Sequence, residues 1–380
     1  MQKVIVGMSG GVDSSVAALM LKEKGYEVSG VTFVLWEPER ETEHVSCCSF
    51  RSIESAERTA EHIGIPHRVL DMRKDFRDKV VIPFANAYMS GLTPNPCILC
   101  NKLIKFPALL REAEKQGAAY IATGHYARIE RCCRFLPGSE SGDEHSCLKK
   151  GVDPRKDQSY VLYPLRPNEL DRLVLPLGEH TKKEVRSMAK NSHLPAAERT
   201  ESQEICFIES GNYHAFVEKI AGSVENPGPI IAVERNEVVG MHKGIHGYTI
   251  GQRKGLGISS PKPLYVVKID PAKNTVYVGT REAAMGKEFL AADLNWIGPP
   301  RSETPGENFF RASVKVRSAM KDEPATIYFE TNPFLAGLPD KRVRVVFDEP
   351  QWAPAPGQSA VFYEGDRVIG GGIIIDVRSL

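Results

Sequence analysis

Over the first two hundred residues, short apolar runs alternate with segments whose apolar residues recur at helical spacing. The apolar runs predict strands at residues 3–6, 28–35, 68–70 and 120–123. Helices are predicted at residues 14–24 and 51–63, and from Pro107 to just before Gly117. A further helix, which ends at Asn191, is predicted to begin with a capping box formed by Thr181 and Glu184. This alternation is typical of an α/β fold with a mostly parallel sheet covered by helices.

The pattern changes after about residue 208. Residues 240–270 carry five Lys or Arg against one acid, which indicates a second, smaller unit. From residue 286 onward, period-two runs separated by Pro and Gly turns predict a β-barrel, with strands at 310–316, 326–329, 343–347, 359–363 and 368–375. We therefore predict three domains, covering residues 1–208, 209–285 and 286–380. The polar stretch 137–146 is predicted to be a mobile hairpin tip.

Composition excludes some classes of protein and leaves others open. With 49 Lys and Arg against 48 Asp and Glu, the formal charge of +1 neither requires nor excludes a nucleic-acid partner. No apolar run reaches the roughly 20 residues of a membrane helix, and the chain opens on a strand-like run rather than a signal segment, so we expect a cytoplasmic protein. Eight cysteines are too few for a disulfide scaffold and are expected to be free thiols unless they bind metal or do redox chemistry.

A glycine-rich turn lies between the first predicted strand and the first predicted helix. Ser9, Gly10 and Gly11 let the backbone fold closely around a phosphate, and the helix that follows presents unpaired N–H groups to it. Asp13 and Ser14, with Ser15, are expected to supply the helix cap and hydroxyl donors. Neither the lysine of a Walker loop nor the G-x-G-x-x-G spacing is present. The alternative is a serine-capped turn without a ligand.

Two further segments contain cysteines in suggestive surroundings. Cys97 and Cys100 form a C-x-x-C pair near Lys102 and Lys105, whose charges favour the reactive thiolate. Structural zinc would normally need a second such pair, which the sequence lacks. Cys206 has apolar neighbours and, taken alone, is typical of a buried small residue. The remaining cysteines have no motif around them and are interpreted as structural or incidental: Cys47, Cys48, Cys132, Cys133 and Cys147.

The segment SGGVDSS resembles the pyrophosphate loop of the N-type ATP pyrophosphatases, which adenylate a carbonyl oxygen and release pyrophosphate. Eight segments in order resemble one family in that superfamily, the bacterial tRNA-specific 2-thiouridylases. They are SGGVDSS, NPCILCNKLIKF, ATGHYAR, KDQSYVLY, SQEICFI, GYTIGQRKGLGI, FDEPQ, and PGQSAVFY followed by GGGII. The resemblance implies ATP-dependent replacement of the C2 oxygen of the wobble uridine by sulfur.

The resemblance also assigns residues and partners. It makes Cys100 the nucleophile and Cys206 the carrier of a persulfide, with a disulfide between them at the end of the reaction. The implied ATP-binding residues are Gly7, Met8, Ser9, Gly10, Gly11, Val12, Asp13, Ser14, Phe33 and Gly124. The implied tRNA contacts are Asn95, Pro96, Cys97, His125, Lys156, Asp157, Gln158, Arg317, Ser318 and Gln358. We expect Mg²⁺ with the ATP, a monomer, the anticodon stem-loop as the RNA partner, and a cysteine desulfurase or sulfur relay protein as sulfur donor.

Two departures from the family pattern leave the mechanism open. Ser318 stands where many relatives have an aromatic residue, which puts a stacking contact there in doubt. Cys97 stands where some relatives have aspartate, so Cys97, Cys100 and Cys206 could hold a [4Fe–4S] cluster. A synthetase that delivers ammonia and an inactive tRNA-binding module also remain compatible with the sequence. The basic stretch bearing Lys243, Arg253 and Lys254 is interpreted as either a phosphate contact or a solvated loop.

Overall fold

The computed structural model describes residues 1–37, 50–134, 143–199, 205–208, 212–222, 225–298, 308–330 and 342–378. The chain forms two compact units, the first made of Met1–Val80, Pro96–Gly211 and Asp366–Val368, and the second of Val81–Asn95, Asn212–Gly365 and Ile369–Leu380. The sequence pattern did not indicate that residues 81–95 belong with the second unit. The three-domain division predicted from the sequence stays a prediction.

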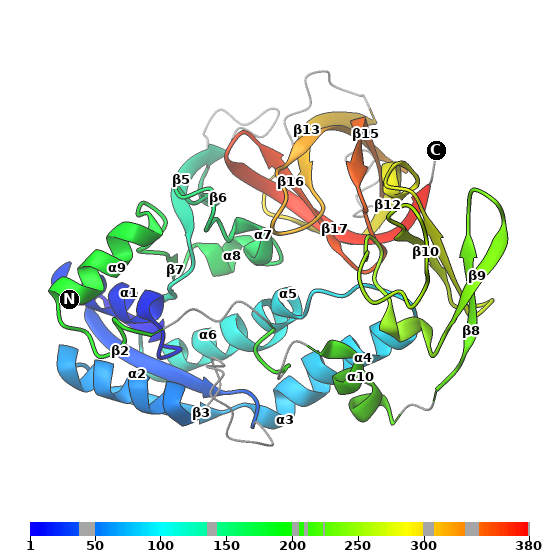
Figure 1. The fold of residues 1–380 in the computed structure, drawn as a ribbon. Coiled ribbons are helices and arrows are strands. Elements are labelled where there is room, and N and C mark those ends of the chain that lie inside the picture. The colour runs from blue at the N-terminus through cyan, green and yellow to red at the C-terminus, as the bar shows by residue number, and fades with distance from the viewer. Residues whose placement is uncertain are drawn as a thin grey trace. The chain divides into compact units, whose positions relative to one another are not determined.

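The first unit is built on a parallel sheet, as the sequence predicts. Its strand order is β3-β2-β1-β4-β7, and every pairing is parallel (Figure 1). The strands are β1 (Lys3–Gly7), β2 (Glu27–Val34), β3 (His67–Asp71), β4 (Tyr120–Ala122) and β7 (Leu173–Val174). The predicted strand bounds agree with these to within a residue or two, and β7 was not predicted.

Helices cover both faces of this sheet because successive strand residues point to opposite sides. Val4 and Val6 of β1 pack in one cluster with residues of α1 (Val12–Glu23) and α2 (Phe50–Ile63). On the other face, Gly7 lies against Leu109 of α6 (Phe106–Lys115). Helix α9 (Lys182–Asn191) packs against α1.

The first residues of helices α9 and α1 can be compared with the caps that the sequence predicts. Thr181 Oγ1 accepts a hydrogen bond from Glu184 N, and Glu184 Oε2 accepts one from Thr181 N, so the predicted capping box of α9 is confirmed. The predicted start of α1 is wrong by two residues, since the N-cap is Gly11 and has no side-chain cap. The hydroxyls of Ser14 and Ser15 instead donate to the carbonyl of Gly11.

A hairpin of β5 (Ala127–Arg134) and β6 (Asp143–Lys150) also belongs to the first unit. The predicted hairpin tip is wrong at residues 143–146, which are in β6; residues 137–142 lie outside the described residues. Cys147 of β6 is disulfide-bonded, so the expectation of free thiols outside the motifs is wrong there. In the register of the hairpin, Cys147 lies opposite Glu130. Cys47 and Cys48 lie outside the described residues.

Short helices complete this unit. They include two π-helical segments, η1 and η2, which continue directly from α3 and α5. The segments are α3 (Arg73–Phe76), η1 (Arg77–Val81), α5 (Pro96–Cys100), η2 (Asn101–Lys105), α7 (Ser159–Leu162) and α8 (Pro167–Leu170).

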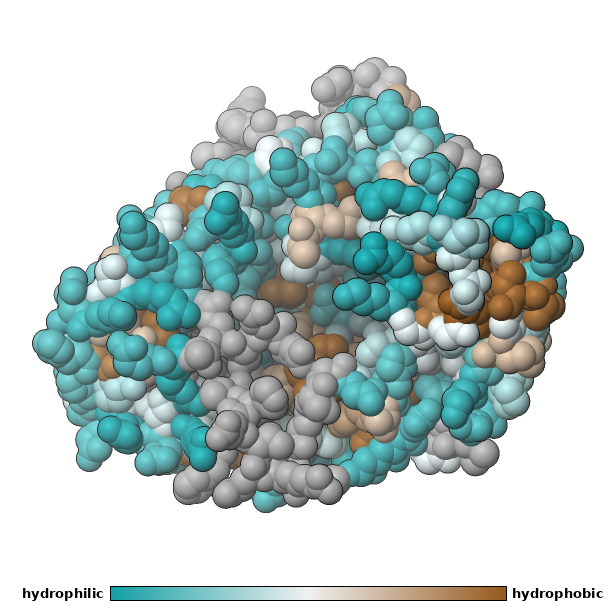
Figure 2. Space-filling view, in the orientation of Figure 1, coloured by the Kyte–Doolittle hydropathy of each residue, from teal (hydrophilic) through white to brown (hydrophobic). Residues whose placement is uncertain are grey.

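The second unit contains a small sheet of order β10-β11-β8-β9. Its elements are α4 (Ile82–Met89), α10 (Tyr213–Ala221), β8 (Gly228–Ala232), β9 (Glu237–His242), η4 (Ile245–Gly247), β10 (Tyr265–Asp270), β11 (Thr275–Gly279) and η5 (Glu282–Ala284). Figure 2 shows a mostly hydrophilic face whose largest apolar area is at the right, where these strands lie in Figure 1. Val238 and Met241 of the edge strand β9 are more than 60% exposed.

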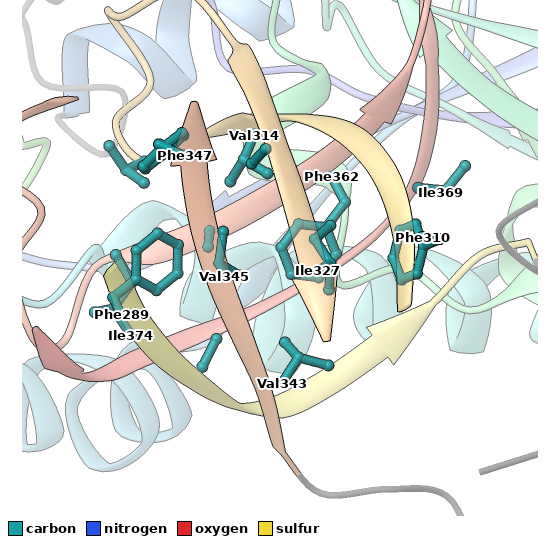
Figure 3. Close-up of a cluster of buried hydrophobic side chains, with 14 of the residues drawn as sticks. Phe289, Phe310, Val314, Ile327, Val343, Val345, Phe347, Phe362, Ile369 and Ile374 are labelled. Carbon is teal, nitrogen blue, oxygen red and sulfur yellow. The ribbon is translucent and has the colours of Figure 1, made fainter. Parts of the chain in front are cut away.

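The rest of this unit is the predicted β-barrel. The strand order is β12-β15-β14-β13-β16-β17, and pairing of β12 with β17 closes it. The strands are β12 (Met285–Trp296), β13 (Phe309–Lys315), β14 (Glu323–Phe329), β15 (Arg342–Trp352), β16 (Ser359–Glu364) and β17 (Arg367–Arg378). Inward side chains such as Phe289, Phe347 and Phe362 fill the interior (Figure 3). The sequence analysis did not predict β12.

In the described ranges, no helix has the length and apolarity to cross a membrane.

Candidate functional site

The strand order of the parallel sheet reverses between β1 and β4. From β1 the chain proceeds to β2 and β3 on one side, whereas β4 and β7 lie on the other. Ligands of open α/β sheets bind outside the carboxyl ends of the strands at such a reversal. The predicted ATP-binding residues 7–14 run from the last residue of β1 into the start of α1, and Gly124 follows β4, so the fold brings these two segments to the same place. Phe33 is buried near the carboxyl end of the adjacent strand β2.

The glycine turn after β1 is fixed by side chains and needs glycine at its centre. Gly10 has φ of +71°, and a Cβ there would lie 2.1 Å from the carbonyl oxygen of Ser52. The Gly10 carbonyl accepts hydrogen bonds from Ser55 Oγ at 2.9 Å and from Arg199 Nη1 at 3.0 Å. The N–H of Ser9 donates to Ser14 Oγ at 3.0 Å. The turn therefore has a defined conformation without any ligand.

The start of α1 offers donors to an anion. Among the described residues, the N–H groups of Gly11 and Val12 have no hydrogen-bond acceptor. Such unpaired N–H groups, together with the helix dipole, favour a negative charge. Gly124 packs directly on this turn, because a Cβ there would lie 2.7 Å from both the carbonyl carbon of Asp13 and the nitrogen of Ser14. The loop after β4 therefore closes over the helix start.

Asp13 does not cap α1 but binds two residues that the sequence analysis missed. Lys182 Nζ lies 2.7 Å and 2.8 Å from its two carboxylate oxygens, and the hydroxyl of Tyr126 donates to Oδ1 at 2.7 Å. Lys182 is the first residue of α9, where the helix dipole disfavours a cation. A lysine at the first position of a predicted helix could therefore have indicated, from the sequence, that Lys182 has an anionic partner.

His125 follows Gly124 and stacks on Phe106, with ring centroids 6.0 Å apart. Its Nδ1 forms a 2.7 Å hydrogen bond with Thr123 Oγ1. Burial, together with the positive charge of Lys105, lowers the pKa of His125 to about 3. The ring is therefore neutral near pH 7, and an RNA contact through it would use Nε2 as a neutral hydrogen-bonding group.

The predicted tRNA contacts at residues 156–158 lie beside this loop. Gln158 Oε1 accepts from the Tyr126 N–H at 2.9 Å, and the Gln158 N–H donates to the Tyr126 carbonyl at 2.8 Å. The carboxylate of Asp157 accepts hydrogen bonds from the N–H groups of Gly151 and Ser159. Lys156 is partly buried. The side chains of Gln158 and Asp157 thus hold the backbone of neighbouring residues in place through hydrogen bonds. Tyr126, which Gln158 contacts, in turn donates a hydrogen bond to Asp13.

The cysteine pair lies on α5. Cys97 is exposed and Cys100 is buried. Cys100 leads into η2 and then to Phe106, the stacking partner of His125, while the Asn101 amide donates to the Val161 carbonyl at 2.9 Å. The segment that carries Cys100 is thereby attached to the loop after β4. Pro96 is buried at the start of α5.

Cys206 lies in another anchored segment. It is half-buried, and its neighbour Phe207 packs against Phe76 and Trp36, with centroid distances of 5.5 Å and 6.3 Å. Trp36 lies two residues past β2, so this segment also borders the carboxyl edge of the sheet. Across the described ranges, no group of three or more His, Cys, Asp or Glu side chains could hold a metal ion. The three cysteines do not form a cluster-binding set in this structure.

The remaining predicted tRNA contacts belong to the second unit. Gln358 Nε2 donates to the Thr93 carbonyl at 2.9 Å, two residues before Asn95, so the fold brings Gln358 close to the Asn95 segment. Arg317 Nη2 donates to the carbonyls of Ile250 and Ala353. Ser318 is exposed in the turn that follows β13.

Comparison with known proteins identifies the class of protein. Family models match residues 2–210 (tRNA methyl transferase HUP domain), 214–280 (tRNA methyl transferase PRC-barrel domain) and 286–374 (aminomethyltransferase beta-barrel domain). Among solved structures, a 4-thiouridine synthetase–RNA complex with bound ATP aligns at 16% identity over 58% of this chain and 50% of that chain, with a TM-score of 0.35, too low to support an argument.

Curated relatives define the family more closely. The tRNA-specific 2-thiouridylase MnmA 1 of Caldanaerobacter subterraneus is 45% identical over 98% of this chain and 97% of its own length. The tRNA-specific 2-thiouridylases MnmA of Acetivibrio thermocellus and Pelotomaculum thermopropionicum are each 44% identical over 98% of this chain and cover 99% and 97% of the relative. The chain belongs to the tRNA-specific 2-thiouridylase family.

Proposed function

We propose that this protein is a tRNA-uridine 2-sulfurtransferase that uses ATP to adenylate the C2 oxygen of the wobble uridine and then replaces it with sulfur. The products are 2-thiouridine in tRNA, AMP and pyrophosphate. The observation that carries the proposal is the glycine turn at the strand-order reversal, with the loop of Gly124 packed on the start of α1 and both cysteine segments anchored at the same edge of the sheet.

Adenylation is needed because the carbonyl oxygen of uridine is a poor leaving group, whereas AMP is a good one. The N–H groups of Gly11 and Val12 are suited to the phosphates of ATP. Asp13 is engaged by Lys182 and Tyr126, so its carboxylate fixes the loop rather than offering oxygens to a metal ion. Mg²⁺ would bind mainly through the phosphates and water, as it commonly does in nucleotide sites.

Sulfur transfer would use two thiols. A terminal persulfide sulfur on Cys206 attacks C2 and AMP leaves; the Cys100 thiolate then attacks the Cys206 sulfur, breaks the sulfur–sulfur bond and leaves the new sulfur on C2. Alternatively, Cys100 first releases the outer sulfur as sulfide, which attacks C2. Both routes end with a Cys100–Cys206 disulfide, which an external dithiol must reduce. A cysteine desulfurase or a relay protein would supply the sulfur.

The RNA partner would be the anticodon stem-loop, whose unpaired bases can be turned out of the stack. The exposed Cys97, the neutral ring of His125 and the residues around Asn95 and Gln358 are the proposed contacts. Gln158 and Asp157 would act mainly by holding the backbone beside His125. No observation favours an iron–sulfur cluster or delivery of ammonia.

The test is in vitro thiolation. Purified protein, ATP, Mg²⁺, a persulfide donor and unmodified tRNA are incubated, and the nucleosides are analysed by mass spectrometry for replacement of one uridine oxygen by sulfur. We expect 2-thiouridine only when ATP is present, with AMP and pyrophosphate formed in equal amounts. Thiolation that continues without ATP, or that proceeds in the Cys206→Ser variant, would contradict the proposal.

A further inference from the structure

Arg199 connects the glycine turn to helix α2. Its guanidinium donates to the Gly10 carbonyl at 3.0 Å, to the Arg51 carbonyl at 3.2 Å and to Ser52 Oγ at 3.1 Å. Ser55 Oγ donates to the same Gly10 oxygen at 2.9 Å. No sequence motif pointed to Arg199, which lies 189 positions from Gly10.

The direction of the Gly10 carbonyl sets the direction of a donor on the other side of the peptide. A trans peptide is planar, so its C=O and the following N–H point in opposite directions. Holding the Gly10 oxygen toward Arg199 and Ser55 therefore turns the Gly11 N–H away from them. Gly11 is the N-cap of α1, and its N–H is one of the donors that a phosphate at this helix end would use.

The backbone alone does not fix this peptide. Gly10 and Gly11 lack Cβ atoms and have access to both signs of φ, so peptide rotation costs less here than in other residues. The acceptors of Arg199 are two carbonyls and one hydroxyl, all of them neutral. The contacts of Arg199 therefore depend on the forked geometry of its guanidinium group rather than on its charge, and a lysine cannot reproduce that geometry.

We propose that Arg199 is a positioning residue for nucleotide binding, which holds the Gly10–Gly11 peptide so that the Gly11 N–H faces the phosphates. The inference rests on the proposed ATP site and adds a residue that does not itself contact ATP. The Gly11 N–H contacts the phosphates as soon as the nucleotide binds, and not only in the transition state. Loss of Arg199 therefore affects nucleotide affinity and the KM for ATP more than kcat.

The test measures equilibrium binding of α,β-methylene-ATP with Mg²⁺ by calorimetry. We expect Arg199→Ala to weaken binding by about tenfold or more, and Arg199→Lys to weaken it to the same degree. The matched control is Arg172→Ala, because Arg172 also donates to two backbone carbonyls, those of Ala118 and Ala119, but at the amino end of β4. Binding by this control should equal that of the unmodified protein.

Each outcome decides between the two proposals. If the unmodified protein does not bind the analogue, the ATP site itself is overturned. If it binds and Arg199→Ala binds equally well, the inference alone is overturned. Full affinity in Arg199→Lys would show that charge rather than geometry acts, which also overturns it. If thermal unfolding shows that Arg199→Ala does not fold, nucleotide affinity is measured for Arg199→Lys, for Ser55→Ala and for the double variant. Non-additive losses of binding free energy support the proposal that both side chains hold the Gly10 carbonyl. Additive losses refute it.

Discussion

One ammonium group holds both oxygens of a carboxylate 169 positions away: Lys182 Nζ lies 2.7 Å from Oδ1 and 2.8 Å from Oδ2 of Asp13. The Lys182 side chain is 11% exposed and that of Asp13 is 32% exposed. The pair ties the start of α9 to the start of α1, and the Tyr126 hydroxyl extends the contact to the loop after β4. It therefore joins three segments around the proposed phosphate site.

Replacing Lys182 by Met should destabilise the first unit. The change leaves Asp13 without its cation in a partly buried position, and we expect a loss of about 1–3 kcal/mol, less than for a fully buried pair. Urea unfolding measures it. The control is Lys190→Met in the last turn of α9, where the pair with Glu198 is exposed and little change is expected. Equal stabilities for the two variants would contradict the importance of the Lys182–Asp13 pair.

Replacing Gly124 by Ala should impair nucleotide binding. The added Cβ would lie 2.7 Å from the backbone of Asp13 and Ser14, so either the loop after β4 or the start of α1 must move. We expect affinity for α,β-methylene-ATP to fall by about tenfold or more.

Gly117→Ala is the matched control for this change. Gly117 has φ of +63° but nothing within 4 Å of an added Cβ, and it lies before the amino end of β4. It should lose about 1 kcal/mol of stability through backbone strain and keep its affinity. The expectation for Gly124 is refuted if its Ala variant folds and binds as tightly as the Gly117 variant.

His125 should make folding stability depend on pH. Its pKa falls from 6.5 in the unfolded chain to about 3 in the folded protein, so between these values the unfolded chain binds one more proton. The stability it contributes is present above pH 6.5 and declines as the pH falls toward 3, by at most about 1.4 kcal/mol per pH unit.

The measurement compares urea unfolding at pH 7.5 and pH 5.5 in the unmodified protein and in His125→Gln. Burial also lowers the pKa values of His67, His214 and His242, so only the difference between the two proteins isolates His125. The variant should show the smaller loss on acidification. An identical loss in both proteins would mean that His125 is not protected from protonation in the folded state.

Cys97, Cys100 and Cys206 should differ in reactivity and in importance. Iodoacetamide should modify the exposed Cys97 first and the buried Cys100 last, as peptide mass mapping can follow. Thiolation should fall by at least about a hundredfold in Cys100→Ser and in Cys206→Ser, because in the proposed transfer Cys206 carries the sulfur and Cys100 breaks the sulfur–sulfur bond. Cys97→Ser should retain measurable turnover. Its complete inactivity, with bound iron in the unmodified protein, would favour a cluster instead.

Sequence patterns predicted elements whose signals are local. The capping box of Thr181 and Glu184 placed the start of α9, and the apolar runs placed β1, β2 and β4 because buried parallel strands are mostly apolar. Strand β12 was missed because register shifts interrupt its pairing with β15 and β17, and Asp293 has φ of +49°, so the period-two alternation is broken.

The site was predicted only in part for a related reason. The glycine turn and the cysteine pair are contiguous in the sequence, whereas the contacts of Asp13 with Tyr126 and of Gly10 with Arg199 join residues 113 and 189 positions apart. Such partners arise from the strand order and from how α2 and α9 pack beside α1. Single-sequence patterns do not contain that information.

The closed ring of the C-terminal strands has a consequence for truncated forms of the protein. Strand β17 is the last described element and pairs with both β12 and β16. A chain that stopped before Arg367 would therefore expose two unpaired strand edges at once, flanked by the apolar interior of the ring. Such edges recruit strands from other chains, so shortened translation products should be prone to aggregate.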